Sequence, residues 1–142
     1  MSPAQVVVAP MLAALVTAVL TTVTRRWPRL QRGLSLAGVA AYVGFVAILG
    51  QQVLADGTAT YQVSMWRPPF GIVLVADALA VFMLAIAAVV GLATLVYSVL
   101  SLGEFSQRVA YHPLFHFMLV GVSGAFLTGD IFNLFVWFEV ML

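Results

Sequence analysis

Long apolar runs alternate with short polar segments along this chain. The first run, residues 4–24, is about as long as the roughly 20 apolar residues that cross a hydrocarbon core about 30 Å thick. A second run covers residues 33–55, and an unusually long third run covers about 70–102. A fourth lies at about 113–127, and a fifth begins at 131. The pattern predicts an all-α polytopic membrane protein with four complete transmembrane helices and the start of a fifth.

The polar segments predict how these helices are connected. Four arginines lie in the sequence RRWPRLQR at residues 25–32, and a longer connection covers residues 56–69. The stretch TYQVSMW in that connection alternates enough to allow a short hairpin or an extended piece. Because arginine-rich loops remain on the cytoplasmic side of a membrane, we expect the N-terminus outside and the fifth helix to run inward.

The fifth run predicts a helix that is too short to cross the membrane. Residues 131–142 would form about 18 Å of helix at a rise of 1.5 Å per residue. A helix that ends in hydrocarbon leaves backbone carbonyl groups without partners, which is strongly unfavourable. We therefore interpret the 142 residues as the N-terminal portion of a longer polytopic protein or as one half of a split one.

Composition agrees with a membrane protein and excludes several classes of function. Hydrophobic residues make up 63% of the chain and charged residues 8%, whereas about a quarter of the residues of soluble domains are charged. The net charge of +1 predicts no binding to nucleic acid. The sequence has no cysteine, which excludes thiolate metal sites and iron–sulfur clusters. No cofactor is expected, and any redox chemistry would belong to a partner chain.

Glu139 is the residue that most needs a functional explanation. It lies nine residues beyond Asp130, about 13 Å into the bilayer. An acidic side chain at that depth costs on the order of 3 kcal/mol, so it normally faces a bundle interior or a hydrated cavity. A carboxyl group whose charge changes with a moving partner suits a proton relay, the interpretation that we favour. The alternative is a neutral acid that only specifies helix packing.

Asp77 and Asp130 are weaker candidates for cation binding. Asp77 would lie about 12 Å into the third run, where anchoring to an adjacent helix is an equally good interpretation. Asp130 and Asn133 share one face of the fifth helix, opposite to Glu139. We expect Asp130 to cap the start of that helix rather than to bind an ion.

His112 and His116 have the i, i+4 spacing of a metal-binding pair on a helix. No third ligand lies within helical reach, so no metal site is expected. Near the cytoplasmic end of the fourth run, such histidines could relay protons or bond a backbone carbonyl, and we favour the carbonyl bond. Gly121, Ala125 and Gly129 recur every four positions along this run and predict close helix packing.

The last part of the chain resembles a known family. The sequence HPLFHFMLVGVSGAFLTGDIFNLFVWFEVML at residues 112–142 is similar to the D-type subunit of Mrp-type (Mnh-type) monovalent cation/proton antiporters. Those subunits are related to the antiporter-like subunits of respiratory complex I and membrane-bound hydrogenases. WRPPFGIVLVADALAVFML at residues 66–84 and Tyr97 support the resemblance, and GAFLTGD followed by FNLFVWFE is its specific part. Ser123 stands where close relatives would have asparagine, a departure that concerns packing more than transport.

The resemblance implies a larger subunit with two inverted helical repeats, in which a glutamate of the fifth span pairs with a lysine of a broken seventh span. Only Glu139 of that pair can be assigned, because the sequence contains no lysine. The implied partners are other membrane subunits of an antiporter, the lipid bilayer, H⁺ and Na⁺ or K⁺. The implied location is the cell membrane, with a multi-pass topology.

Three functions are compatible with the sequence. The leading hypothesis is a membrane subunit of a multi-subunit Na⁺(K⁺)/H⁺ antiporter, in which Glu139 is a proton-relay carboxylate. The second is the proton-pumping membrane subunit of an NADH:quinone oxidoreductase or a membrane-bound hydrogenase, which would use the same carboxylate. The third is a split or truncated piece that does not transport.

Overall fold

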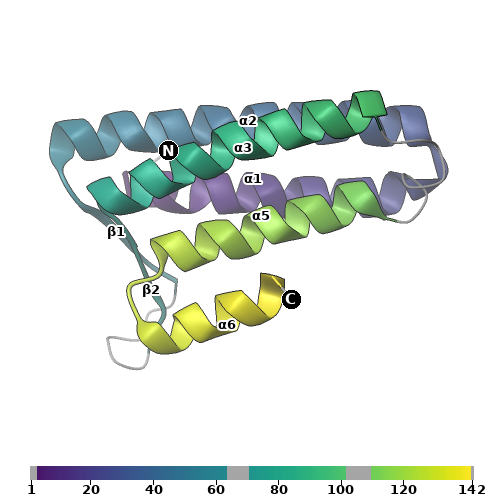
Figure 1. Ribbon diagram of the computed structural model, residues 1–142. Coiled ribbons are helices and arrows are strands. Elements are labelled where there is room, and N and C mark those ends of the chain that lie inside the picture. Colours follow the sequence, from purple (N-terminus) through teal and green to yellow (C-terminus); the bar gives the residue numbers. More distant parts are fainter. Residues whose placement is uncertain (1–2, 64–70, 102–109, 142) are drawn as a thin grey trace.

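A computed structural model describes residues 3–63, 71–101 and 110–141, and it is almost entirely helical (Figure 1). The predicted helical fold class is confirmed, with the addition of one small hairpin. In chain order the elements are α1 (Pro3–Val23), the 3₁₀ turn η1 (Thr24–Arg26), α2 (Pro28–Asp56), β1 (Ala59–Gln62), β2 (Val73–Ala76), α3 (Ala78–Ser101), α5 (Tyr111–Leu127) and α6 (Ile131–Met141).

Three of the described helices are long and apolar enough to cross a membrane, by length and composition: residues 4–26, α2 and α3. Helix α2 begins at Pro28 rather than at residue 33. Proline is favoured in the first turn of a helix, where its missing N–H is not needed. The helices α5 and α6 are also apolar but shorter, with 17 and 11 residues. At 1.5 Å per residue, α5 is about 25 Å long.

Helices α1, α2, α3 and α5 form a four-helix bundle. α1 packs against α2 and α5, and α3 packs against α2 and α5 on the other side (Figure 1). Helix α6 lies outside this bundle, where its main contact is α5. The bundle interior is apolar, and its fully buried members include Val7, Val39, Tyr42, Leu49, Leu84 and Leu95. Large apolar side chains also cover the outer faces of the helices, as expected for surfaces that contact lipid.

Small residues allow the helices to approach closely where they pack. A Cβ atom added to Gly38 of α2 would overlap the side chain of Thr17 of α1. On α5, an added Cβ would overlap the Trp137 ring at Gly124 and the Met141 side chain at Gly121. The predicted close packing along the fourth run is confirmed at Gly121, and its partner is α6.

The polar connection after α2 contains the first of two strands that pair antiparallel. Gly57, with φ of 82°, turns the chain out of α2. Strands β1 and β2 then pair with Ala59 opposite Ala76 and Gln62 opposite Val73. The predicted extended piece is therefore confirmed as β1.

The prediction that the third helix begins at about residue 70 is wrong. Val73–Ala76 is a strand, and the helix begins at Ala78. Periodicity does not distinguish a short apolar strand from a buried helical segment. The strand is held from both sides, by β1 and by the turn before α6. Leu74 bridges Thr128, and the Gly129 N–H donates to the Val73 carbonyl at 2.8 Å. The proline pair at 68–69 and the predicted end of the run at 102 lie outside the described residues.

The close approach of α1 and α2 can be tested with two glycines of the same helix. We expect Gly38→Ala to lower the free energy of unfolding by about 1–3 kcal/mol, because the added methyl group overpacks the contact with Thr17. Gly44→Ala is the matched control, since a Cβ there meets nothing within 4 Å. It should leave stability unchanged or raise it slightly. Unfolding of the intact subunit by titration with a denaturing detergent measures both. Equal effects of the two substitutions would contradict the packing described.

Candidate functional site

The charged side chains of the described residues lie at the two ends of the bundle, with one exception. The arginines of residues 25–32 gather at η1 and the start of α2. Asp56 ends α2, while Asp77 and Asp130 stand immediately before α3 and α6, at the end that carries the hairpin (Figure 1). Glu139 lies between these ends, within α6. It is therefore the one charged group, among the described residues, that lies away from both polar ends.

Helix α6 presents two different faces. Its inner face packs on α5, with Trp137 over Gly124 and Met141 over Gly121. Its outer face is exposed in this chain and carries Glu139. The large apolar side chains exposed on the same helix are Ile131, Phe132, Phe135, Val136, Phe138 and Val140. Glu139 is thus a single carboxyl group in an apolar surface, about 13 Å along the helix axis from Asp130.

Asp130 caps the start of α6, as predicted. Its Oδ1 atom accepts the backbone N–H of Phe132 at 2.7 Å and that of Asn133 at 3.2 Å. These are two of the donors that have no partner inside a helix at its first turn. The Asn133 side chain is buried and donates from Nδ2 to the Thr128 hydroxyl at 3.0 Å. The predicted separation of Asn133 and Glu139 onto opposite faces is confirmed by their burial and exposure.

Asp77 does not lie deep within a helix, contrary to the prediction. It is exposed and precedes α3, where its Oδ1 atom accepts the Ala80 N–H at 2.7 Å. The difference arises because the chain enters the helix only after β2. A hollow at this end of the bundle is lined by Asp77, Thr128 and Gly129, among others, but not by Asp130. The two aspartates therefore share one end of the molecule without lining one pocket.

His112 and His116 are buried in the bundle and meet at one hydroxyl group. The exposed fraction of each is 1% or less. Ser35 Oγ of α2 lies 3.0 Å from His112 Nδ1 and 2.9 Å from His116 Nε2. The prediction that these histidines bond a backbone carbonyl is wrong, because their partner is the Ser35 side chain of another helix. Within the described residues no group of three His, Cys, Asp or Glu side chains could hold a metal ion.

A second polar pair joins α2 and α5 further along. Tyr42 Oη lies 2.9 Å from Ser123 Oγ, and the Ser123 hydroxyl donates to the Leu119 carbonyl at 2.6 Å. Because a serine hydroxyl has one proton, Tyr42 must be the donor in the contact between the two side chains. Ser123 thus has the packing role expected of it.

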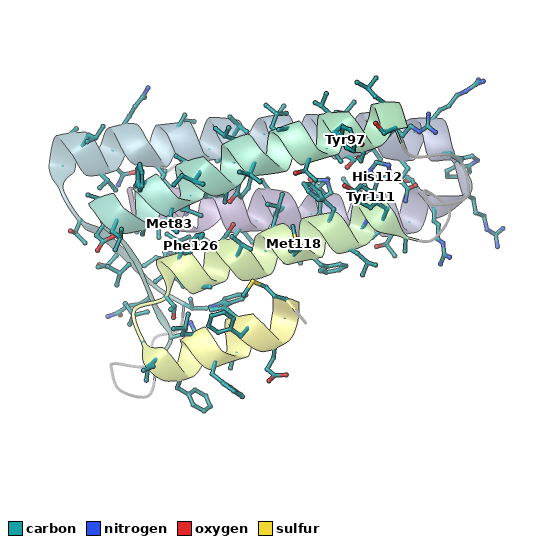
Figure 2. All side chains as sticks on the ribbon, in the orientation of Figure 1. Met83, Tyr97, Tyr111, His112, Met118 and Phe126 are labelled. Atoms are coloured by element: carbon teal, nitrogen blue, oxygen red, sulfur yellow. The ribbon has the colours of Figure 1, made fainter. Side chains whose placement is uncertain are left out.

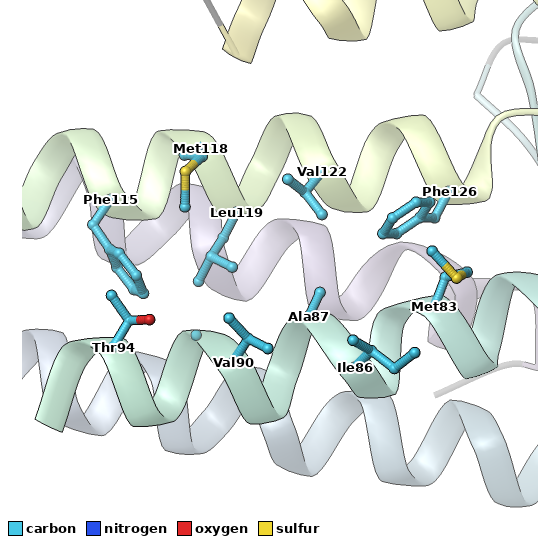
Figure 3. A pocket seen from close by; sticks show the side chains of 11 residues that line it. Met83, Ile86, Ala87, Val90, Thr94, Phe115, Met118, Leu119, Val122 and Phe126 are labelled. Atoms are coloured by element: carbon cyan, nitrogen blue, oxygen red, sulfur yellow. The ribbon is translucent and has the colours of Figure 1, made fainter. Parts of the chain in front are cut away.

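An apolar groove of about 260 Å³ lies between α3 and α5 (Figure 3). Met83 and Phe126 lie at one end of it, and Thr94 faces Phe115 at the other. Thr94 provides the one polar side chain among the described residues that line it. A groove of this composition has too few oxygen atoms to replace the hydration shell of a cation, so it is not the ion site.

Comparison with known proteins identifies related chains, although no protein-family model matches the sequence. The chain is 40% identical over 136 residues to the D-type Na⁺/H⁺ antiporter subunit of Bacillus subtilis, covering 96% of this chain and 28% of that protein. The corresponding antiporter subunit of Alkalihalophilus pseudofirmus is 41% identical over 113 residues, or 80% of this chain and 23% of that protein. The N-type subunit of the NADH-quinone oxidoreductase of Desulforudis audaxviator is 33% identical, and the match covers 97% of this chain and 28% of that protein.

Solved structures share the fold. A chain in the Mrp complex from Dietzia sp. DQ12-45-1b matches with a TM-score of 0.84 and 28% identity, covering 99% of this chain and 26% of that chain. A chain of the membrane-bound sulfane sulfur reductase, an archaeal respiratory membrane complex, matches with a TM-score of 0.89 and 25% identity. This match covers 96% of this chain and 28% of that chain.

The chain spans less than a third of the length of the relatives that it matches. Its apolar helices and these relatives indicate a multi-pass membrane protein, and the two antiporter subunits above are more similar to it in sequence than the oxidoreductase subunit is. The predicted resemblance is confirmed: this chain is a homologue of the D-type subunits of Mrp-type monovalent cation/proton antiporters.

Proposed function

We propose that these residues form the N-terminal membrane portion of the D-type subunit of a multi-subunit Na⁺(K⁺)/H⁺ antiporter in the cell membrane. In this proposal Glu139 carries protons within the membrane. The observation that carries it is the position of Glu139, a single carboxyl group between two charged ends, on an antiporter-subunit homologue. Other membrane subunits of the complex, lipid, H⁺ and the transported cation are its partners.

The distribution of charge supports an orientation in which the N-terminus is outside. Arginines of residues 25–32 lie at one end, which the positive-inside rule assigns to the cytoplasm. Asp56, Asp77 and Asp130 lie at the opposite, external end. In this orientation α5 is the fourth span, and α6 runs inward from its cap.

Glu139 requires a protein environment that these residues do not provide. A carboxylate in hydrocarbon costs about 2.5–3.5 kcal/mol on insertion scales, whereas Glu139 lies on the exposed face of α6. In the whole subunit this face is therefore covered by further protein. A basic side chain there would favour the charged carboxylate, and its withdrawal would favour the neutral acid. That alternation lets one carboxyl group take up a proton on one side and release it on the other.

A second candidate function is proton pumping in a redox-driven complex. The N-type oxidoreductase chain is related in sequence and the sulfane sulfur reductase chain shares this fold, and a proton-relay glutamate would serve either complex. The two functions differ in what drives proton movement. In membrane vesicles from cells that make the intact complex, an antiporter collapses a pH gradient when Na⁺ or K⁺ is added, whereas a redox pump needs an electron donor.

Replacement of Glu139 tests the proton-relay proposal. Glu139→Gln in the intact complex should lower the initial rate of cation-driven proton movement by about 100-fold or more, because the amide cannot take up a proton. Glu139→Asp should retain part of the rate, since it keeps the carboxyl group but shortens its reach. The measurement is the change in a fluorescent pH indicator on adding Na⁺ or K⁺ to vesicles.

The matched control is Val140→Ala, the exposed neighbour of Glu139 on α6. It should assemble and transport normally. Unchanged antiport with Glu139→Gln, at equal amounts of assembled complex, would exclude the proposed role.

The two helix-capping aspartates give a separate prediction about cation binding. Asparagine retains an oxygen that accepts the N–H groups at a helix start, but it carries no charge. We expect Asp77→Asn and Asp130→Asn to leave the cation concentration for half-maximal antiport unchanged, because both groups act as caps. Asp130→Ala should destabilise the protein by about 0.5–2 kcal/mol. A large rise in the half-maximal concentration for either asparagine variant would instead assign that aspartate to the cation site.

A further inference from the structure

Three buried side chains form a continuous hydrogen-bonded chain across the α2–α5 interface. His112 Nδ1, Ser35 Oγ and His116 Nε2 are joined by contacts of 3.0 and 2.9 Å. The other ring nitrogen of each histidine, His112 Nε2 and His116 Nδ1, is buried and has no hydrogen-bond partner among the described residues. The chain therefore has two ends, and each end is an unpaired nitrogen atom.

A packing role alone does not account for this arrangement. A buried polar atom without a partner costs about 1–3 kcal/mol, and here two histidines each contribute one. Apolar side chains would fill the same space without that penalty. Imidazole differs from them because it can accept a proton on one nitrogen and release another from the second nitrogen.

The hydroxyl group of Ser35 couples the two rings. It has one proton, so it can donate to one ring only and must accept from the other. In the first arrangement His112 Nδ1–H donates to Ser35, and Ser35 donates to His116 Nε2, so that His116 Nδ1 carries the other proton. In the second arrangement every donor and acceptor is exchanged, and the free proton is on His112 Nε2.

We propose that Ser35, His112 and His116 form a proton wire at the arginine-rich end of the bundle. A proton that binds His112 Nε2 displaces the proton on Nδ1 to Ser35 Oγ. The Ser35 proton passes to His116 Nε2, and His116 Nδ1 releases its own proton. One proton enters and one leaves, no side chain gains a lasting charge, and the rings and hydroxyl reorient before the next transfer.

The position of this wire suits exchange between the cytoplasmic surface and the membrane interior. His112 lies on the first turn of α5, at the end of the bundle where that helix begins (Figure 2), and His116 lies one turn deeper. The wire rests on the proposed antiport function, in which the arginine-rich end is cytoplasmic. It adds a proton path that is separate from Glu139, which lies on the outer face of α6.

Among the residues that the structure describes, few other ionisable groups lie near the wire. On α2 the positive charge of Arg32, one turn before Ser35, acts on His112. On α5 the Tyr111 ring meets the His112 ring edge to face, with centroids 5.5 Å apart. The sequence of α1 contains no ionisable side chain, and that of α3 contains only Tyr97. Within the described parts of the packed helices, these two imidazole rings are therefore the groups that can both accept and release a proton.

Substitution of Ser35 in the intact complex tests the wire. Ser35→Ala removes the link between the rings and should lower the antiport rate about tenfold or more at alkaline pH, with a smaller loss at neutral pH. The loss grows with pH because free protons become scarcer and their delivery limits the rate. Ser35→Thr keeps a hydroxyl group and should restore most of the rate. The readout is the indicator signal in everted vesicles, divided by the amount of assembled complex.

Two further variants keep the result interpretable. Ser98→Ala is the matched control, because Ser98 is also buried but bonds only a carbonyl of its own helix, that of Leu95. It should have no pH-dependent effect. His116→Gln can still hydrogen-bond Ser35 but cannot accept a proton on one atom and release it from another, so it should reproduce the alkaline loss even if Ser35→Ala fails to assemble.

The outcomes separate this inference from the proposed function. Normal antiport at all pH values with Ser35→Ala or His116→Gln, or a loss that is the same at every pH, would overturn the wire. When the wire is overturned in this way, inactivity of Glu139→Gln in the same vesicles would still support the proposed function. If Glu139→Gln is fully active, the proposed function itself is wrong.

Discussion

The absence of water from a membrane interior is the constraint on which this structure depends. Each polar group there must find a partner inside the protein. The threonines near the end of α1 find partners within their own helix. Thr17, Thr21 and Thr22 donate to carbonyls three or four residues earlier at 2.7–3.0 Å. Gln31 finds a partner in another helix, by donating from Nε2 to the Thr21 carbonyl at 2.8 Å. The polar residues of the bundle thus hold α1 to α2 and α2 to α5.

Against this background, two titratable features of the described residues stand out as departures; the buried Trp137 Nε1 atom, which does not titrate, also lacks a partner. The outer nitrogens of the histidines are buried without partners, and Glu139 is placed on an exposed apolar face. Both are titratable groups in surroundings that do not satisfy them. In membrane proteins such groups are rare and are retained where ions or protons move. The packing of the helices, with its apolar core and its interhelical hydrogen bonds, fixes their positions.

Much of the fold could be predicted because hydrophobic length is a strong signal in membranes. The first run agrees with α1 to within a residue or so at each end, and the capping role of Asp130 followed from its place before an apolar run. The third run was misjudged because Val73–Ala76 pairs with β1, a contact between segments that periodicity does not encode. The same error placed Asp77 too deep.

The partner of the histidines was also not predictable from local sequence. Their spacing indicated a shared face of one helix, but Ser35 is 77 and 81 residues away along the chain. A lone serine in an apolar helix carries no signal of its own. What could have identified it is the requirement that two histidines inside an apolar bundle need a hydroxyl or carbonyl group opposite them.

The length of α5 has a consequence for the surrounding lipid. Its 17 residues span about 25 Å, about 5 Å less than a typical hydrocarbon core. Bilayers adapt to a short span by thinning beside it, at a modest elastic cost. If α5 is the fourth span, as proposed above, lipid beside its exposed Leu114 and Met118 would form a thinner membrane than lipid beside α2 or α3. The helix that carries the histidines would then cross the narrowest part of the dielectric barrier.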